Sequence, residues 1–300
     1  ITISANGASN SPQDVPVTLT VSNTPSIFLI APNGGEKIKG GSAYDIRWDS
    51  TKAGIHHIHI RYTTDGTTYQ DIIANTADDD SYTWDPVPLL NSGSIRVKIL
   101  AENASNIEQA SDISDGFFMI DSTKPETGLE LTGTEGQNGW WVSSVTVKLM
   151  PTDNLSGVKE AKYKINDGSW MTYYSPFVVA GSTIRYYAED NVGNMEAEKS
   201  VEIKIDKTPP GIPAVTDDGD CTTDGSKLHA TWTSTGDLES GLVEYQYAIG
   251  RTPGGIDVIG WTSVGTSTQV TKTGLSLVNG QEYYLSVKAK NGAGLWSDPR

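Results

Sequence analysis

The fold of this 300-residue chain is constrained most by proline-containing segments that recur at regular spacing. The clearest is the run Ile205-Asp206-Lys207-Thr208-Pro209-Pro210, with related runs at 120–125 and 21–25. Proline lacks a backbone N–H and holds the preceding residue extended, so a strand ladder ends at such a run. Asp206 follows Asp121 by 85 residues, and Asp121 follows Asn23 by 98, each about the length of one β-sandwich domain. We predict short, stiff linkers at these runs; the alternative is ordinary loops within one larger sandwich.

The composition favours short strands. The chain has 31 Gly and 14 Pro for turns, and 13 Tyr and 8 Trp against only 4 Phe. Apolar stripes with a helical period and a helical length are missing, whereas alternating runs bounded by Gly, Pro, Asn and Asp are frequent. The predicted fold class is all-β, with tandem Ig-like or fibronectin III-like β-sandwiches joined by short proline-containing linkers.

The linkers divide the chain into four predicted segments. Residues 1–23 would be the C-terminal hairpin of an upstream sandwich, 24–121 and 122–207 two Ig-like sandwiches, and 208–300 a fibronectin III-like sandwich. The chain begins within an alternating run and ends soon after Trp296-Ser297, where a last strand should follow, so we expect a piece of a longer protein. In the second segment alternation predicts strands at 26–31, 44–48, 55–62, 69–73, 81–84, 94–100 and 116–120.

The first two segments carry motifs of prokaryotic surface proteins. The runs 1–3 and 15–21, separated by a Gly/Asn/Ser-rich turn, resemble the end of a bacterial carbohydrate-associated N-terminal (BACON) module. The runs Pro32-Asn33-Gly34-Gly35-Glu36 and Tyr62-Thr63-Thr64-Asp65-Gly66, with the alternating strand at 41–48, resemble the Ser-Thr-rich GPI-anchored (yeast cell-wall synthesis-like) domain of bacterial and archaeal surface proteins. This resemblance implies a sandwich and a surface location.

The last two segments carry further motifs of this kind. Residues 122–207 hold Asp153-x-x-Ser156-Gly157, a Tyr/Trp-rich hairpin at 163–170 and Ala188-x-Asp190-x-x-Gly193-Asn194. In this order they resemble the Ig-like repeat of bacterial surface proteins named after a leptospiral outer-membrane protein. In 208–300, the alternating strand ending at Trp232 and the strand after Tyr283 resemble a fibronectin type III domain, with Gly280 in the turn where that family often has proline.

The two segments also resemble each other. Asp153-x-x-Ser156-Gly157 matches Asp237-x-x-Ser240-Gly241, 84 residues later, and 191–194 matches 291–294 loosely. Repeats at one-domain spacing are typical of an array in which each unit has its own core.

Acidic residues give the leading metal hypothesis. The net charge of −15 suits calcium, which binds oxygen ligands, and disfavours binding to nucleic acid or anionic membrane. Asp121 and Asp206 stand at linkers, and Asp153 and Asp190 at the two ends of the repeat motif, so these four are candidate calcium ligands that would stiffen the array. The alternative is that each aspartate caps a turn through its own side chain. The acidic run 217–220 lacks the distal glutamate of an EF-hand.

Other candidate sites have simpler alternatives. His57 and His59 would lie together on the outer face of a strand. Because the sequence offers no third metal ligand near them, we predict that this face is polar and exposed. Trp140 and Trp141 must point to opposite faces if extended, and are candidate carbohydrate-binding residues or cross-strand packing residues. Cys221, the single cysteine, cannot form an intrachain disulfide and would be a small hydrophobe at the start of a strand.

The functional prediction is structural. No motif of a hydrolase, metalloprotease or P-loop enzyme occurs, and we predict a chain without catalytic residues. We expect an extracellular or cell-surface stalk, spacer, or surface-layer or filament subunit. The alternative is an adhesin or the accessory carbohydrate-binding region of a large secreted hydrolase. The expected partners are neighbouring domains of the same chain, with copies of itself or cell-surface polysaccharide as open alternatives; a membrane-spanning segment is not expected.

Overall fold

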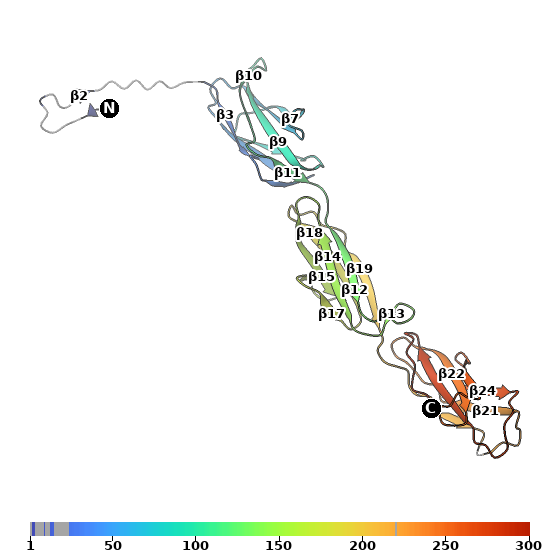
Figure 1. Cartoon of the computed structure of the whole chain (residues 1–300). Coiled ribbons are helices and arrows are strands. Elements are labelled where there is room, and N and C mark those ends of the chain that lie inside the picture. The colour runs from blue at the N-terminus through green and yellow to red at the C-terminus, as the bar shows by residue number, and fades with distance from the viewer. Residues whose placement is uncertain (1, 4–8, 10–12, 15–23, 220) are drawn as a thin grey trace. The chain divides into compact units, whose positions relative to one another are not determined.

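The computed structural model describes residues 2–3, 9, 13–14, 24–219 and 221–300 (Figure 1). Every regular secondary-structure element in these residues is a β-strand, so the fold class is all-β, as predicted. At the N-terminus β1 (Thr2–Ile3) pairs antiparallel with β2 (Gln13–Asp14). The second predicted run of the N-terminal hairpin, 15–21, lies outside the described residues. No helix in the described residues is long and apolar enough to cross a membrane.

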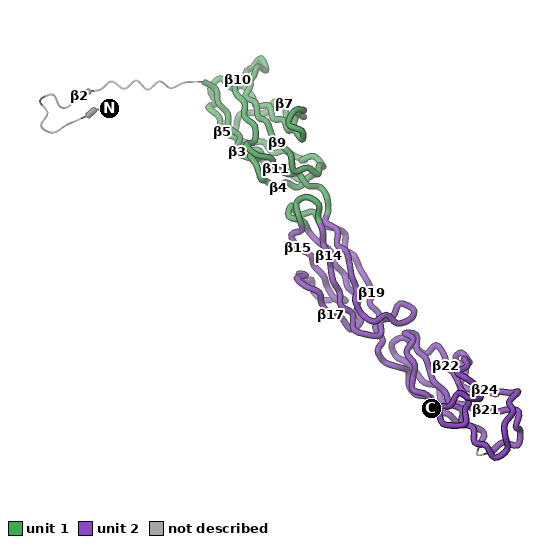
Figure 2. The backbone as a smooth tube through the Cα atoms, in the orientation of Figure 1, with its two compact units in different colours: residues 1–124, 153–157, 190–194 green, residues 125–152, 158–189, 195–300 purple. Residues whose placement is uncertain are grey.

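The chain forms two compact units (Figure 2). Unit 1 contains Ile1–Lys124 together with two later segments, Asp153–Gly157 and Asp190–Asn194. Unit 2 contains Pro125–Thr152, Val158–Glu189 and Met195–Arg300. Two loops that follow strands of unit 2 are therefore packed as part of unit 1, and these loops carry the candidate ligands Asp153 and Asp190.

Beyond the β1–β2 pair, unit 1 forms a sandwich of two sheets. One sheet has the order β3 (Ile27–Ala31), β5 (Tyr44–Ser50) and β8 (Ser81–Trp84). The other has the order β4 (Lys37–Lys39), β11 (Phe118–Asp121), β9 (Asn91–Glu102), β6 (His57–Thr63) and β7 (Tyr69–Thr76), with β10 (Glu108–Ile113) also paired to β9. Only β4 and β11 pair in parallel; the other pairs in this unit are antiparallel.

The core of this sandwich follows the alternation in the sequence. On β5, Ile46 and Trp48 are buried while Asp45 and Arg47 are exposed, because successive side chains point to opposite faces. All seven predicted strands are present. The strands β4 and β10 were missed because each has mostly polar residues and at most one buried apolar side chain, Ile38 in the case of β4.

Unit 2 contains four sheets and two apolar cores. The first pair of sheets has the orders β12 (Glu126–Thr132), β14 (Val145–Thr152), β17 (Phe177–Val179), and β13 (Trp140–Trp141), β19 (Lys199–Ile205), β18 (Ser182–Asp190), β15 (Val158–Ile165), β16 (Met171–Thr172). The second pair has the orders β20 (Val215–Asp217), β21 (Lys227–Trp232), β24 (Gln269–Thr273), and β23 (Ile259–Ser263), β22 (Leu242–Gly250), β25 (Tyr284–Asn291). The cores are centred on Ile184 and on Tyr245, both fully buried, and share no residue with each other or with the core of unit 1.

The last strands carry the features expected from the fibronectin III resemblance. The Tyr283 hydroxyl accepts a hydrogen bond from the backbone N–H of Val278 at 3.0 Å, which is a tyrosine corner. Gly280 has a φ of +79°, a conformation that side chains with a Cβ rarely adopt. After β25 the chain returns antiparallel along it: Ser297 N donates to Ala289 O at 2.8 Å and Arg300 N donates to Val287 O at 3.0 Å.

The prediction for Cys221 is wrong. Cys221 is exposed and lies outside any strand. The segment between β20 and β21 is rich in Asp, Thr and Gly, so it forms a polar loop and offers no apolar site for the thiol.

Candidate functional site

Three carboxylates from distant parts of the sequence converge in unit 1. Asp121 is the last residue of β11, Asp153 follows β14 and Asp190 is the last residue of β18. One carboxylate oxygen of each lies within 4.8 Å of those of the other two. Asp121 and Asp190 are completely buried. We call these three residues the first acidic cluster; three of the four predicted calcium ligands are thus brought together.

Backbone N–H groups orient each carboxylate. Asp153 Oδ1 accepts hydrogen bonds from the N–H groups of Leu155 and Gly157, at 3.1 and 2.7 Å. Asp190 Oδ1 accepts in the same way from residues 192 and 194, and Asp121 Oδ1 from residue 123. These are the turn caps that the sequence offered as the alternative to calcium. Asn194 Nδ2 also donates to Asp190 Oδ2 at 2.7 Å, whereas Asp153 Oδ2 accepts no hydrogen bond from the described residues.

Two polar atoms at this cluster are buried without a partner among the described residues: Asp153 Oδ2 and Ser156 Oγ. Ser156 is only 2% exposed, and its backbone N–H donates to Asp121 Oδ2 at 2.9 Å. The nearby ammonium groups bind main-chain oxygens instead: Lys37 Nζ donates to Ser156 O at 2.9 Å and Lys39 Nζ to Gly193 O at 2.6 Å. In the described part of the chain, no ion pair within 4.0 Å reaches the three carboxylates.

A second group of acids stands in unit 2. The second acidic cluster consists of Asp206, after β19, and of Asp237 and Glu239 in the loop between β21 and β22. Asp206 is 1% exposed and Glu239 is exposed. The fourth predicted calcium ligand, Asp206, therefore does not join the other three.

The amide of Asn291 fills the second acidic cluster. Asn291 is fully buried at the end of β25, and its Nδ2 donates to Asp206 Oδ2 at 2.8 Å and to Asp237 Oδ2 at 3.1 Å. The same amide group reaches Thr208 O at 3.0 Å. The Ser240 hydroxyl donates to Asp206 Oδ2 at 2.5 Å. Buried donors thus satisfy the carboxylates of Asp206 and Asp237 without a metal ion.

The two clusters stand on equivalent loops, with Asp190 and Asn194 in the first at the positions of Asn291 and Leu295 in the second. Asn191 N donates to Gly157 O at 2.9 Å, and Gly292 N donates to Gly241 O at 2.8 Å. Asp190 therefore corresponds to Asn291, one residue away from the alignment of 191–194 with 291–294 expected from the sequence, which is corrected here. The better signal was the strand end, where Ala188-x-Asp190 matches Ala289-x-Asn291. Sequence reasoning missed Asn291 as a functional residue because only ionisable side chains were considered.

The hydrogen bonds to Asp237 make the second acidic cluster sensitive to acid. Burial alone would raise the pKa of this carboxyl, but hydrogen bonds from Asn291 Nδ2 and from the N–H groups of Ser240 and Gly241 outweigh burial and lower the pKa below its ordinary value. A carboxyl with a lowered folded-state pKa contributes stability above its unfolded pKa of about 3.9, and this stability is lost as the pH falls through the folded-state pKa.

We therefore expect Asp237→Asn to reduce the free energy of unfolding of unit 2 by about 1–2 kcal/mol at pH 7, because the new amide donor faces that of Asn291. The difference from the unchanged chain should shrink as the pH falls below about 4. Urea denaturation from pH 7 to pH 3 measures both effects. Glu239→Gln, at the exposed acid of the same cluster, should keep the acid dependence of the unchanged chain; a parallel loss in both variants would contradict the assignment to Asp237.

The prediction for the histidines is wrong for His57. His57 is 4% exposed, and its Nε2 lies 2.9 Å from Glu102 Oε2, which stands opposite on β9. His59 is half-buried, with Nε2 2.8 Å from Asp71 Oδ1 and Nδ1 3.5 Å from Glu102 Oε1. A carboxylate on the paired strand draws the imidazole into the structure, which alternation along one strand could not show.

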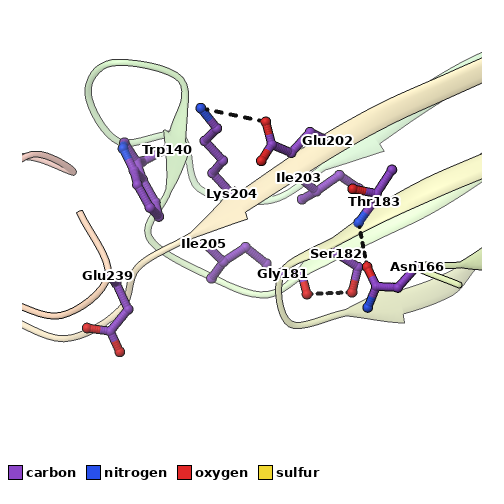
Figure 3. Close-up of a pocket in the computed structure, with 10 residues that line it drawn as sticks. All are labelled: Trp140, Asn166, Gly181, Ser182, Thr183, Glu202, Ile203, Lys204, Ile205 and Glu239. Carbon is purple, nitrogen blue, oxygen red and sulfur yellow. Dashed lines mark hydrogen bonds and ion pairs between the residues drawn. The ribbon is translucent and has the colours of Figure 1, made fainter.

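The tryptophans of β13 have different surroundings. Trp141 packs against the core of the first sandwich of unit 2, whereas Trp140 lines a shallow depression of about 360 Å³ (Figure 3). Lys204, which pairs with Glu202 at 3.7 Å, and Glu239 also line it. Carbohydrate binding by Trp140 or Trp141 stays a prediction.

Comparisons with known proteins give only structural similarity. No protein-family model and no curated protein matches the chain. Among solved structures, the chain is similar to the fibronectin(III)-like modules of CbhA from Clostridium thermocellum, with 13% identity over 60% of this chain and 94% of that one, at a TM-score of 0.28. It is also similar to the I-band fragment I67–I69 of titin, with 12% identity over 89% of this chain and 94% of that one, at a TM-score of 0.39. The chain's description as tandem Ig-like or fibronectin III-like β-sandwiches stands on the sheets and cores above.

Proposed function

We propose that this chain is a non-catalytic structural array of β-sandwiches, a stalk, spacer or surface-assembly subunit of a larger extracellular or cell-surface protein. The observation that carries the proposal is the anchoring of the linkers. A linker between freely moving domains would expose its polar backbone to water. Here Asp121 and Asp206 are buried at the linkers, and both are hydrogen-bonded to loops that come later in the sequence.

The linker contacts extend beyond the two aspartates. In unit 1, Ser122 N donates to Asn91 Oδ1 at 2.8 Å and Ser122 Oγ to Leu90 O at 2.9 Å. In unit 2, the loop between β12 and β13 joins the two sandwiches beside the linker: Gln137 N donates to Ala293 O at 2.8 Å and Asn138 Nδ2 to Gly292 O at 2.9 Å. Bonds of this kind restrict the rotation of a linker and favour a load-bearing or spacing role.

Separate cores and surface charge support the same role. Each of the three apolar cores is complete in itself, as in arrays whose stability is a sum over repeats and their interfaces. The net charge of −15 favours solubility. With one cysteine the chain forms no intrachain disulfide and gains no stability from one. The resemblances to BACON, GPI-anchored-type and leptospiral-type modules support the surface location. The adhesin or hydrolase-accessory alternative depends on a ligand, and Trp140, which lines the depression of about 360 Å³, is the candidate side chain for it.

A measurement of linker stiffness in unit 2 tests the proposal. Spin labels at Met150→Cys on β14 and Thr273→Cys on β24, in a Cys221→Ser background that removes the exposed thiol, report the distance across the Asp206 linker. We expect a narrow distance distribution that broadens in Asp206→Ala, because that change removes the buried acceptor of three hydrogen bonds. Asp298→Ala, at an exposed site, should leave it narrow. A broad distribution in the labelled parent chain would contradict a stiff linker.

A further inference from the structure

We propose that the first acidic cluster binds one divalent cation of the calcium class, with Asp121, Asp153 and Asp190 as its carboxylate ligands. This inference goes beyond the structural role proposed above, and that role does not depend on it. Because the equivalent cluster in unit 2 carries the amide of Asn291 at the position of Asp190, the cation belongs to one linker and not to the other.

Among the described residues, no cationic side chain pairs with the three carboxylates of the first acidic cluster, whose hydrogen-bond donors are neutral N–H groups. Three carboxylate oxygens lie within 4.8 Å of one another, and Asp121 and Asp190 have no solvent exposure. Like charges at such distances in a buried site repel strongly unless a cation, a proton or a donor stands between them. Lys37 and Lys39 moderate the negative potential of the surrounding loops, but their ammonium groups bind main-chain oxygens and do not lie between the carboxylates.

The buried polar atoms without partners indicate where a cation would bind. Asp153 Oδ2 and Ser156 Oγ are polar, buried and without a hydrogen-bond partner among the described residues, which is rare in folded proteins. Ser156 lies between two of the carboxylates: its own N–H donates to Asp121, and the N–H groups on either side of it donate to Asp153. A divalent cation held by Asp153 Oδ2 would satisfy this oxygen and offset most of the charge of the three carboxylates, with the Ser156 hydroxyl as an additional neutral oxygen.

The two clusters differ in the side-chain donors that reach their carboxylates. There, the amide of Asn291 bridges Asp206 Oδ2 and Asp237 Oδ2, and the Ser240 hydroxyl donates to Asp206. In the first cluster the residue equivalent to Asn291 is Asp190, which has no hydrogen to donate, and the hydroxyl equivalent to that of Ser240 has no partner. The amide of Asn194 donates to Asp190 Oδ2 at 2.7 Å and to Thr123 O at 3.1 Å, but no donor reaches Asp153 Oδ2 among the described residues.

The donor set selects the class of cation. All the ligand atoms are oxygens, which favour calcium or magnesium over zinc and copper. Oxygens up to 4.8 Å apart can be opposite ligands of one calcium ion, because Ca–O distances are about 2.3–2.6 Å. Magnesium requires about 2.0–2.1 Å and near-ideal octahedral geometry, which oxygens fixed by backbone turn caps are less able to provide.

Calcium titration of the full chain tests the proposal. Isothermal titration calorimetry with CaCl₂ should show one ion bound per chain. The melting temperature should be higher in about 5 mM calcium than in EDTA, because this concentration exceeds the dissociation constants of even the weakest extracellular calcium sites. Asp153→Asn keeps the Oδ1 turn cap and removes only the charge at the unpartnered oxygen, so it should lower the affinity about tenfold or more.

Two control variants in the second acidic cluster locate the site. Asp237→Asn occupies the equivalent position and Glu239→Gln removes the exposed acid of that cluster; both should bind calcium as the unchanged chain does. Lack of binding in the unchanged chain, or undiminished affinity in Asp153→Asn, would overturn the proposal. Loss of binding in Asp237→Asn alone would move the site to the second cluster, and equal stabilisation by magnesium at the same concentration would overturn the choice of calcium.

Discussion

Replacing Asn291 with Asp is expected to create a second calcium-dependent cluster. The variant removes the amide that donates to Asp206, Asp237 and Thr208, and places a carboxylate at the position that Asp190 has in the first cluster. In EDTA, we expect the free energy of unfolding of the C-terminal sandwich to fall by about 3–5 kcal/mol, the usual effect of leaving buried charges without a partner. Saturating calcium should restore most of this loss, and calorimetry should report two ions per chain instead of one.

The reverse exchange gives the matched control. Asp190→Asn introduces an amide in the first cluster while its Oδ1 can still accept the N–H groups of Val192 and Asn194. This variant should bind no calcium and should be as stable in EDTA as in calcium. If Asn291→Asp is as stable as the unchanged chain in EDTA, or gains no ion, the equivalence of the two clusters is wrong. Should Asn291→Asp not fold without calcium, the reverse variant still decides the question.

Trp48→Ala is expected to have the largest effect on unit 1. Trp48 is 1% exposed in the centre of the core, and its Nε1 donates to Asp78 Oδ1 at 2.9 Å. Truncating a buried tryptophan to alanine usually costs about 3–5 kcal/mol. Because the three cores share no residue, hydrogen exchange should accelerate in the strands of unit 1 and stay unchanged in β22 and β25.

Phe28→Ala is the control for this loss, since Phe28 lies on the neighbouring strand β3 but is 61% exposed. It should change exchange rates little anywhere. Faster exchange throughout the chain in Trp48→Ala would show that the sandwiches unfold as one cooperative body, contrary to an array of independent cores.

Much of the fold could be predicted because alternation is a local property. A strand such as β5, with Tyr44, Ile46 and Trp48 on one side, shows its buried face within a few residues. The strand β10 could not be found this way, since its contribution to the core is the single side chain of Ala110 and its pairing depends on β9. Pairing partners distant in sequence are what a local pattern lacks.

The candidate site was predictable only in part for the same reason. Asp121 and Asp190 end strands and Asp153 follows one, each before a turn, and this made them candidates one by one. Their convergence depends on which strand ends come together in space. The role of Asn291 depends on the alignment of two loops, and counting from Asn191 instead of Asp190 hid it. Burial of His57 likewise depends on Glu102, 45 residues away on the facing strand.

The Asn291-Gly292 pair also affects the chemical lifetime of this linker. Asparagine followed by glycine is the sequence most prone to deamidation, in which the backbone nitrogen of the glycine attacks the side-chain amide. Here that nitrogen donates to Gly241 O at 2.8 Å, and the amide is buried and hydrogen-bonded, so attack requires the linker to open. When the linker opens, this attack expels ammonia and forms a succinimide, which water opens to aspartate or isoaspartate at position 291. The hydrogen bonds of Asn291 and Gly292 therefore slow the deamidation of Asn291. The fraction of chains that carry an acid at position 291 increases with the number of times the linker has opened.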